Sequence, residues 1–369
     1  MKKYFEGLNT LRFIGAFSVI IGHIELIKSF YGISNLMNIP FYKYTNGHIG
    51  VILFFVLSGF LITYFLLEEL KNNNRIDIKK FYIKRLLRIW PIYYLMILTA
   101  IFILPKILFL LNHNKIDYTL KDYIYYLLFL PNIAKANLNF IPGATHLWSL
   151  GVEEQFYLIW PLLIYKFRKN LLVVFTLVFL VISLIPPFID FIYVRSISFQ
   201  NFPLIKGFLS SLCIEFKINA MALGGLIAYI HHSKYKIPNF ILTKSFEVLT
   251  IVIVFSSWIL GINYGVYSDE IYAFGFSLII FSLTYNRNSI MIFKNVIIDY
   301  LGKISYGLYV YHWIVIVLII EILKAMKINF NKELILTNCI IYSLSIGLTI
   351  CISHFSYKYL ELFFTKKGK

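Results

Sequence analysis

Two ionisable residues lie eleven positions apart in a strongly apolar segment near the start of the chain. Arg12 and His23 both fall within residues 8–27. Eleven helical residues return to within about 20° of the same face and rise about 16 Å, so we expect both side chains to enter one cavity at two depths. An arginine guanidinium binds phosphate in a fork, and a histidine imidazole transfers protons near neutral pH. The alternative is that Arg12 is an interfacial anchor and His23 a hydrogen-bonded core residue.

A second group of polar residues crowds the start of the apolar run at 148–165. Its members are His146, Trp148, Ser149, Glu153 and Glu154. Ser149 is expected to cap a helix, and acidic residues suit the first turn because the helix dipole is positive there. The spacing of Glu153, Tyr157 and Trp160 places them on one helix face. The Glu153 carboxylate would orient a histidine or act as a base itself, whereas the structural alternative is that both acids only complete the helix end.

Residues 79–91 carry a cluster of cations next to another apolar run. Lys84, Arg85 and Arg88 lie at the expected cytoplasmic mouth of a span at 89–110. Each of them alone is explained as a topology signal, since cytoplasmic loops are rich in Lys and Arg. Taken together with Arg12, they form a good site for the phosphates of a nucleotide-like donor.

Residues 305–313 bring a further histidine into an apolar run. Tyr306, Tyr309 and His312 are spaced three apart and make one polar stripe on a predicted helix. On such a stripe His312 fits a polar pocket, whereas a lone histidine there would be a core residue. Ser58 and Gly59 are small residues that allow helices to approach closely, and we interpret them as packing residues.

These residues are set in a chain suited to a membrane, with 59% hydrophobic and only 14% charged residues. A charged side chain at the bilayer centre costs about 3 kcal/mol, so ionisable residues there face a polar cavity, pair or do chemistry. The net charge of +17 would suggest nucleic acid in a soluble protein. Here the basic residues lie in short loops, where we expect them to lie against anionic lipid headgroups; the alternative is that they bind phosphate-bearing ligands. We predict contacts with membrane lipids, no nucleic-acid partner, and a location in the cell inner (cytoplasmic) membrane.

The apolar runs predict an all-α, polytopic transmembrane helical bundle. About ten spans can be drawn, at 8–27, 48–69, 89–110, 148–165, 171–190, 215–231, 246–262, 270–285, 305–323 and 334–356. The inner segments then hold 22 Lys and Arg residues against 12 in the outer loops, which favours cytoplasmic N- and C-termini. A weaker run at 123–130 is too short to cross and is expected to be interfacial or re-entrant. No internal repeat or linker divides the chain, so we expect one membrane-embedded domain over 1–369.

The cysteines and one histidine pair are the remaining candidates for metal binding. Cys213, Cys339 and Cys351 show neither the spacing of metal ligands nor a disulfide framework and are expected to be packing residues. His231 and His232 are interpreted as part of a solvated turn. We therefore predict no metal site and no bound cofactor.

The motifs, taken in order, resemble the acyltransferase 3 family of bacterial integral membrane O-acyltransferases. The resemblance covers nearly the whole chain and is carried by residues 8–12 with His23, 54–62, 84–91, 146–157 and 305–312. It implies a ten-span membrane domain with the N-terminus inside. It also implies transfer of an acyl group, usually acetyl, from cytosolic acyl-CoA to a hydroxyl of an extracytoplasmic glycan such as lipopolysaccharide, capsule, exopolysaccharide or peptidoglycan.

The resemblance gives weight to particular residues and also has departures. The resemblance implies functional roles for Arg12, His23, Arg85, Arg88 and the segment 148–153. Lys84 replaces an arginine often found in relatives, which keeps the charge but loses the fork. Gly151 stands where many relatives have serine, and Glu361 lacks the proline that commonly follows it. Because some relatives carry a fused periplasmic hydrolase-like domain and this chain ends too soon for one, a stand-alone form is expected.

We therefore predict a membrane O-acyltransferase with acyl-CoA, most simply acetyl-CoA, as co-substrate. The expected donor-binding residues are Arg12, Arg85 and Arg88. The expected catalytic residues are His23, Glu153 and His312. His23 would deprotonate the acceptor hydroxyl or accept the acyl group, with Glu153 orienting it, but which of the three is the base stays open. The expected substrate pocket is formed by His146, Trp148, Ser149, Glu154 and Tyr306.

Two other functions use the same buried residues. A transporter or exporter of a glycan or small solute would use His23 and Glu153 as a proton relay. An O-acyltransferase acting on a small molecule is the other alternative. Dependence on acyl-CoA separates the transporter from the enzyme. A homodimer and a separate periplasmic transferase partner are both left open.

Overall fold

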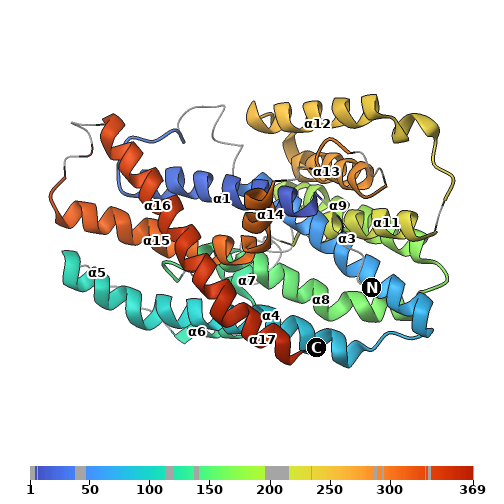
Figure 1. Ribbon diagram of the computed structural model, residues 1–369, viewed down its shortest axis with the longest axis horizontal. Helices are drawn as coiled ribbons and strands as arrows, with labels where there is room; N and C mark the ends of the chain where they lie inside the picture. The colour runs from blue at the N-terminus through green and yellow to red at the C-terminus, as the bar shows by residue number, and fades with distance from the viewer. Residues whose placement is uncertain are drawn as a thin grey trace.

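The fold is a bundle of helices that run mostly along one direction. The computed structural model describes residues 5, 7–37, 47–112, 120–136, 141–195, 216–233, 235–285, 289–292, 295–328, 330 and 334–368. Within these ranges the regular elements are helices, without a strand. Figure 1 shows helix α4 (Ile78–Leu98) at one edge of the bundle and α12 (Lys244–Ile259) at the opposite edge. The prediction of an all-α polytopic bundle is confirmed.

The long helices follow the predicted apolar runs. They are α1 (Leu8–Phe30), α3 (Gly47–Asn73), α4 (Ile78–Leu98), α8 (Trp148–Lys166), α9 (Leu171–Arg195), α11 (Ile218–Ser233), α12 (Lys244–Ile259), α13 (Ser268–Tyr285), α15 (Ser305–Ala325) and α16 (Leu334–Ser356). Shorter helices are α5 (Leu104–Asn112), α6 (Leu120–Leu127), α7 (Pro131–Ala136), α14 (Val296–Lys303) and α17 (Leu362–Lys367).

Several of these segments can cross a membrane. Six are long and apolar enough among the described residues: Leu8–Phe30, Gly47–Asn73, Ile78–Leu111, Gly265–Tyr285, Ser305–Ala325 and Ile335–Lys367. The chain is therefore a multi-pass membrane protein. The predicted count of ten spans and the cytoplasmic position of both termini stay predictions.

Two helices extend beyond the apolar runs from which they were predicted. Helix α4 begins at Ile78 rather than near residue 89, because the Asp77 carboxylate accepts a hydrogen bond from the Lys80 amide at 2.9 Å and caps the helix. A π-helical turn, η1 (Thr99–Ile103), joins α4 to α5. A second one, η6 (Tyr357–Glu361), carries α16 on into α17. Hydrophobic periodicity marks only the apolar part of a helix, so the polar extensions were missed.

The short run predicted near residues 123–130 forms α6, which is too short to cross a bilayer. Two tyrosine hydroxyls of α4 form hydrogen bonds with the last turn of α6. Tyr93 donates to the carbonyl of Tyr126 at 2.8 Å, and Tyr94 donates to the carbonyl of Leu127 at 3.0 Å. These bonds satisfy carbonyl groups that a helix end leaves unpaired.

Helices α3 and α11 approach each other through glycines. A Cβ atom on Gly59 would lie 1.9 Å from the Met221 carbonyl oxygen, and one on Gly224 would lie 2.1 Å from the Val56 carbonyl oxygen. The prediction that the Ser58–Gly59 step allows close packing is thus confirmed. The packing fixes α3 against its neighbours, and α3 carries one wall of the cavity described below.

Two minor predictions are wrong. His231 and His232 lie in the last turn of α11, not in a solvated turn, and contact residues of α3 and α13. Cys339 and Cys351 are exposed on α16 instead of packed inside, and Cys213 lies outside the described residues. In a chain this apolar, composition does not distinguish a side chain that faces lipid from one that faces the core.

Candidate active site

A cavity of about 240 Å³ lies between α1, α3, α4, α8 and α15. Its charged lining residues, among those described, are Arg12, Arg85, Arg88 and Glu153. Three guanidinium groups therefore face one carboxylate. An excess of positive charge in a recess with apolar walls attracts an anionic ligand. The three arginines come from two separate segments of the sequence, and the fold brings them to one cavity as predicted.

The arginines are held by polar and aromatic neighbours. Arg12 donates from Nη1 to Asn9 Oδ1 at 3.1 Å, and Asn9 donates from Nδ2 to Asp299 Oδ1 at 2.8 Å. Helix α14, which carries Asp299, therefore positions Arg12 through Asn9. The Arg85 guanidinium lies 5.5 Å from the centre of the Tyr157 ring, a cation–π contact. Arg88 is exposed to the cavity and its surroundings.

The Glu153 carboxylate accepts hydrogen bonds from side chains of two helices, α3 and its own helix α8. Its Oε1 accepts a hydrogen bond from Ser58 Oγ at 2.8 Å, and its Oε2 accepts one from Tyr157 Oη at 3.1 Å. The predicted sharing of one helix face by Glu153 and Tyr157 is thus observed. Both partners line the cavity, so the carboxylate faces the arginines. The expected contact in which Glu153 orients His23 is not seen.

His23 pairs with another histidine instead. His23 Nδ1 lies 2.7 Å from His312 Nε2, and His312 Nδ1 lies 3.2 Å from the Leu308 carbonyl oxygen. A carbonyl oxygen only accepts, so the His312 hydrogen is on Nδ1 and its Nε2 is an acceptor. His23 must then donate from Nδ1. The hydrogen on Nδ1 leaves the Nε2 atom of a neutral His23 with a free lone pair.

His146 lies beside this pair. Its Nε2 donates to the Val310 carbonyl oxygen at 3.0 Å, and its ring stacks on Trp313 with centroids 5.5 Å apart. Burial and the neighbouring His312 lower the pKa of His146 well below its ordinary value, so this ring stays neutral. Its Nδ1 is buried without a hydrogen-bond partner among the described residues.

The single cavity expected for Arg12 and His23 is divided. His23 and His312 do not line the cavity, although Tyr306 and Tyr309 do. The Phe54 and Tyr309 rings, whose centroids lie 6.1 Å apart, both line the cavity. Helical spacing relates the two positions on α1 but does not show which side chains of other helices lie between them.

Tyr309 connects the cavity to the histidines. Its hydroxyl donates to the His146 carbonyl oxygen at 2.6 Å and accepts from Ser149 Oγ at 2.6 Å. The Tyr309 and His312 rings lie 5.8 Å apart. The prediction that Ser149 caps α8 is wrong, because a 3-10 turn, η2 (Thr145–Leu147), runs directly into a helix that begins at Trp148. Ser149 lies inside the first turn, where its side chain lines the cavity.

The remaining predicted pocket residues take different positions. Tyr306 lines the cavity and donates to the Ile89 carbonyl oxygen at 2.9 Å. Glu154 turns towards α4, where its Oε2 accepts a hydrogen bond from Trp90 Nε1 at 3.1 Å. Trp148 lies outside the cavity lining and stacks on His48, with ring centroids 6.2 Å apart. Glu154 and Trp148 therefore contact residues of α4 and α3 and do not line the cavity.

Sequence reasoning missed three polar residues near the site. Ser58 was assigned to packing alone, yet it also binds Glu153. Glu361 was given little weight, yet it is 93% buried in the π-helical turn η6. His48 was not considered, although it bonds to Asp269 at 2.8 Å. A histidine directly before the apolar run of α3 was the available signal for His48.

Fold and site together define a multi-pass membrane protein with a cationic cavity that Tyr309 separates from a histidine pair. The chain belongs to the acyltransferase 3 family, whose model, described as an acyltransferase domain, matches residues 5–357.

Similar proteins carry related names. A protein of Staphylococcus aureus strain COL is 27% identical over 393 residues, which cover 99% of this chain and 58% of that protein. The O-acetyltransferase OatA of Staphylococcus aureus strain NCTC 8325 is 25% identical over 99% of this chain and 58% of its own length. The peptidoglycan O-acetyltransferase OatA of Listeria monocytogenes is 34% identical over 173 residues, 46% of this chain and 25% of that protein. The chain thus spans little more than half of the curated relatives it matches over its full length. No solved structure matches it.

Proposed function

We propose that the protein is a cell-envelope O-acetyltransferase of the cytoplasmic membrane, which moves an acetyl group from acetyl-CoA to a hydroxyl of a glycan. One observation carries the proposal: a cavity with three arginines reaches Tyr309, whose ring lies 5.8 Å from His312 of a histidine pair that leaves His23 Nε2 free to accept a proton. Family membership supports the acyl transfer. The name of the Listeria relative, a peptidoglycan O-acetyltransferase, supports a glycan acceptor.

The arginine cavity is assigned to the donor. Coenzyme A carries its negative charge on phosphate groups, and arginine binds phosphate through parallel hydrogen bonds. Arg12, Arg85 and Arg88 would hold these phosphates, and Glu153 is the only carboxylate among the described residues that line the cavity. His23 lies about 16 Å along α1 from Arg12. The flexible arm of the donor therefore has to pass Tyr309 to bring its thioester to the histidines.

The histidine pair is assigned to the proton transfer. His23 Nε2 takes the proton of the acceptor hydroxyl while the oxygen attacks the thioester carbonyl carbon. A C–O bond forms and the C–S bond breaks, and His23 returns the proton to the departing thiolate. His312 keeps His23 in the required tautomer by accepting its Nδ1 hydrogen. This is the positioning role that a carboxylate performs in a catalytic triad.

Transfer of labelled acetyl groups tests this function. Purified protein receives acetyl-CoA labelled in the acetyl group, together with soluble peptidoglycan fragments released by a muramidase. We expect label in the fragments, released again by mild base as an ester would be. Arg12→Ala should raise the KM for acetyl-CoA, whereas Arg168→Ala, at an exposed turn outside the cavity, should not. Folded protein that moves no acetyl group to the fragments contradicts the proposal.

A further inference from the structure

A second histidine is held by a carboxylate outside the cavity. His48, the second residue of α3, donates from Nε2 to Asp269 Oδ1 of α13 at 2.8 Å. Lys217 Nζ binds the other oxygen, Asp269 Oδ2, at 2.8 Å. The His48 side chain is 44% exposed, whereas those of Asp269 and Lys217 are 15% and 11% exposed. The imidazole is thus fixed at one nitrogen and open at its other edge.

The bond to Asp269 decides which nitrogen can bind a ligand. A carboxylate only accepts hydrogen bonds, so the His48 hydrogen is on Nε2 and a neutral ring has its lone pair on Nδ1. Nδ1 has no hydrogen-bond partner among the described residues. A fixed, exposed acceptor nitrogen of this kind can accept a hydrogen bond from a hydroxyl group.

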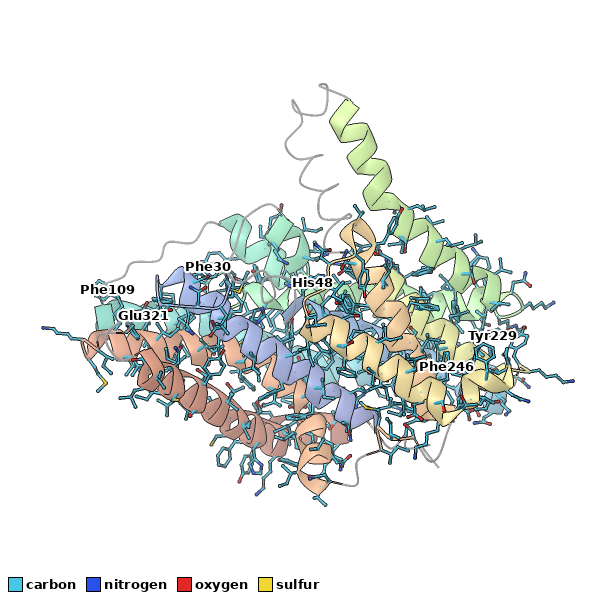
Figure 2. All side chains as sticks on the ribbon, turned by 90° about the horizontal axis from the view of Figure 1, so that it is seen from above. Phe30, His48, Phe109, Tyr229, Phe246 and Glu321 are labelled. Atoms are coloured by element: carbon cyan, nitrogen blue, oxygen red, sulfur yellow. The ribbon has the colours of Figure 1, made fainter. Side chains whose placement is uncertain are left out.

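His48 lies at the level of His23. A Cβ atom on the preceding residue, Gly47, would lie 3.5 Å from His23 Nε2. Figure 2 shows His48 near the middle of the long axis, between the end marked by Phe30 and Glu321 and the end marked by Tyr229 and Phe246. A hydroxyl compound held at His48 is therefore close to the base and about 16 Å along α1 from the level of Arg12.

The surroundings of His48 favour hydroxyl groups over net charge. The Lys135 Nζ lies 4.2 Å from the centre of the Trp148 ring, on which His48 stacks. Lys135 and Lys217 are offset by the acidic pair Asp269 and Glu270. An aromatic ring beside an exposed acceptor nitrogen, in a region with balanced charge, suits the hydroxyl groups of a neutral sugar.

We infer that His48, oriented by Asp269, is a positioning residue for the acceptor, whose sugar hydroxyl donates a hydrogen bond to His48 Nδ1. This inference rests on the proposed function, because it names where the glycan of that reaction binds. It adds a specificity residue on α3 that the donor cavity does not include.

Two substitutions of His48 with opposite expectations test the inference. Asparagine places an amide where Nδ1 lies and loses the contact with Asp269, whereas glutamine places one where Nε2 lies and keeps that contact. Binding of muramidase-released peptidoglycan fragments to the purified protein is measured by calorimetry. We expect His48→Gln and His48→Ala to weaken binding about fivefold, the value of one net hydrogen bond, and His48→Asn to weaken it less. A purely structural His48 gives the reverse order of Asn and Gln.

Controls separate this inference from the proposed function. His232→Ala, at the far end of α11, should bind fragments like the wild type. Equal binding by His48→Gln and wild type, or no binding by folded wild type, overturns the inference. If the binding pattern holds but wild type moves no acetyl group from acetyl-CoA, the transferase function fails while the glycan subsite stands.

Discussion

Two substitutions of His312 separate its hydrogen-bonding role from its place in the core. The side chain is fully buried, and its Nε2 accepts the hydrogen of His23 Nδ1 at 2.7 Å. Glutamine places an amide oxygen close to the position of Nε2 and still accepts this hydrogen. Leucine fills the space but accepts nothing, so His23 is free to carry its hydrogen on Nε2, where the lone pair is needed.

The size of the effect follows from the loss of the base. General base catalysis contributes about 10²–10⁴-fold to a rate, and a serine-protease triad left in the wrong tautomer loses about 10⁴-fold. His312→Leu should therefore lower kcat by about 10²–10⁴-fold, which corresponds to about 2.7–5.5 kcal/mol of activation free energy. His312→Gln should stay within about tenfold of wild type. The KM for acetyl-CoA should change little in either variant, because His312 is not among the cavity-lining residues.

Initial rates of acetyl transfer, measured against acetyl-CoA concentration, give kcat and KM for each variant. Leaving His23 Nδ1 buried and unpaired, in either tautomer, costs about 1–3 kcal/mol, so thermal unfolding must first show that His312→Leu is folded. Equal loss of kcat in both variants would refute the tautomer mechanism. So would a folded His312→Leu protein with more than a third of wild-type kcat.

Three further predictions concern packing and ligand contacts. Gly59→Ala should lower the unfolding temperature by an amount equivalent to about 1–3 kcal/mol, because its methyl would lie 1.9 Å from a carbonyl oxygen of α11, whereas Gly347→Ala meets nothing within 4 Å and should not. Gly47→Ala should fold normally but lower kcat, because its methyl would sit 3.5 Å from His23 Nε2, where the reacting groups must enter. Ser58→Ala should leave the protein folded and alter the KM for acetyl-CoA by about threefold to tenfold, since it frees Glu153 Oε1 to approach the arginines.

Controls for these three predictions use the same measurements. Equal unfolding temperatures for Gly59→Ala and Gly347→Ala would show that α3 and α11 can separate without cost. Wild-type kcat in Gly47→Ala would mean that the acyl group reaches a different face of His23. An unchanged KM in Ser58→Ala would mean that Glu153 does not act on the donor.

The sequence predicted the helices and the convergence of the arginines well. Apolar runs of span length locate the helices because a bilayer demands them. Arg12, Arg85 and Arg88 were expected together because all three lie at the expected cytoplasmic ends of their spans, and all three line the cavity. The Tyr306–Tyr309 stripe was also predictable, since residues three apart share a helix face.

The contacts between histidines were not predictable from the sequence. His23 and His312 are 289 positions apart, and their 2.7 Å contact depends on how α1 packs on α15. Glu153 was expected to reach His23 because both are ionisable and buried, but Ser58 on α3 competes for it at 2.8 Å. Hydrophobic patterning gives the face of each helix but not its rotation against a neighbour, and that rotation decides such pairs.

The most direct test of the proposed function compares wild type with His23→Ala in a single transfer assay. Both purified proteins receive labelled acetyl-CoA and muramidase-released peptidoglycan fragments, and mass spectrometry detects fragments that have gained one acetyl ester. We expect acetylated fragments with wild type only, with His23→Ala reduced by at least about 10²-fold while acetyl-CoA still binds. Near-normal acetylation by His23→Ala would contradict the assignment of His23 as the base.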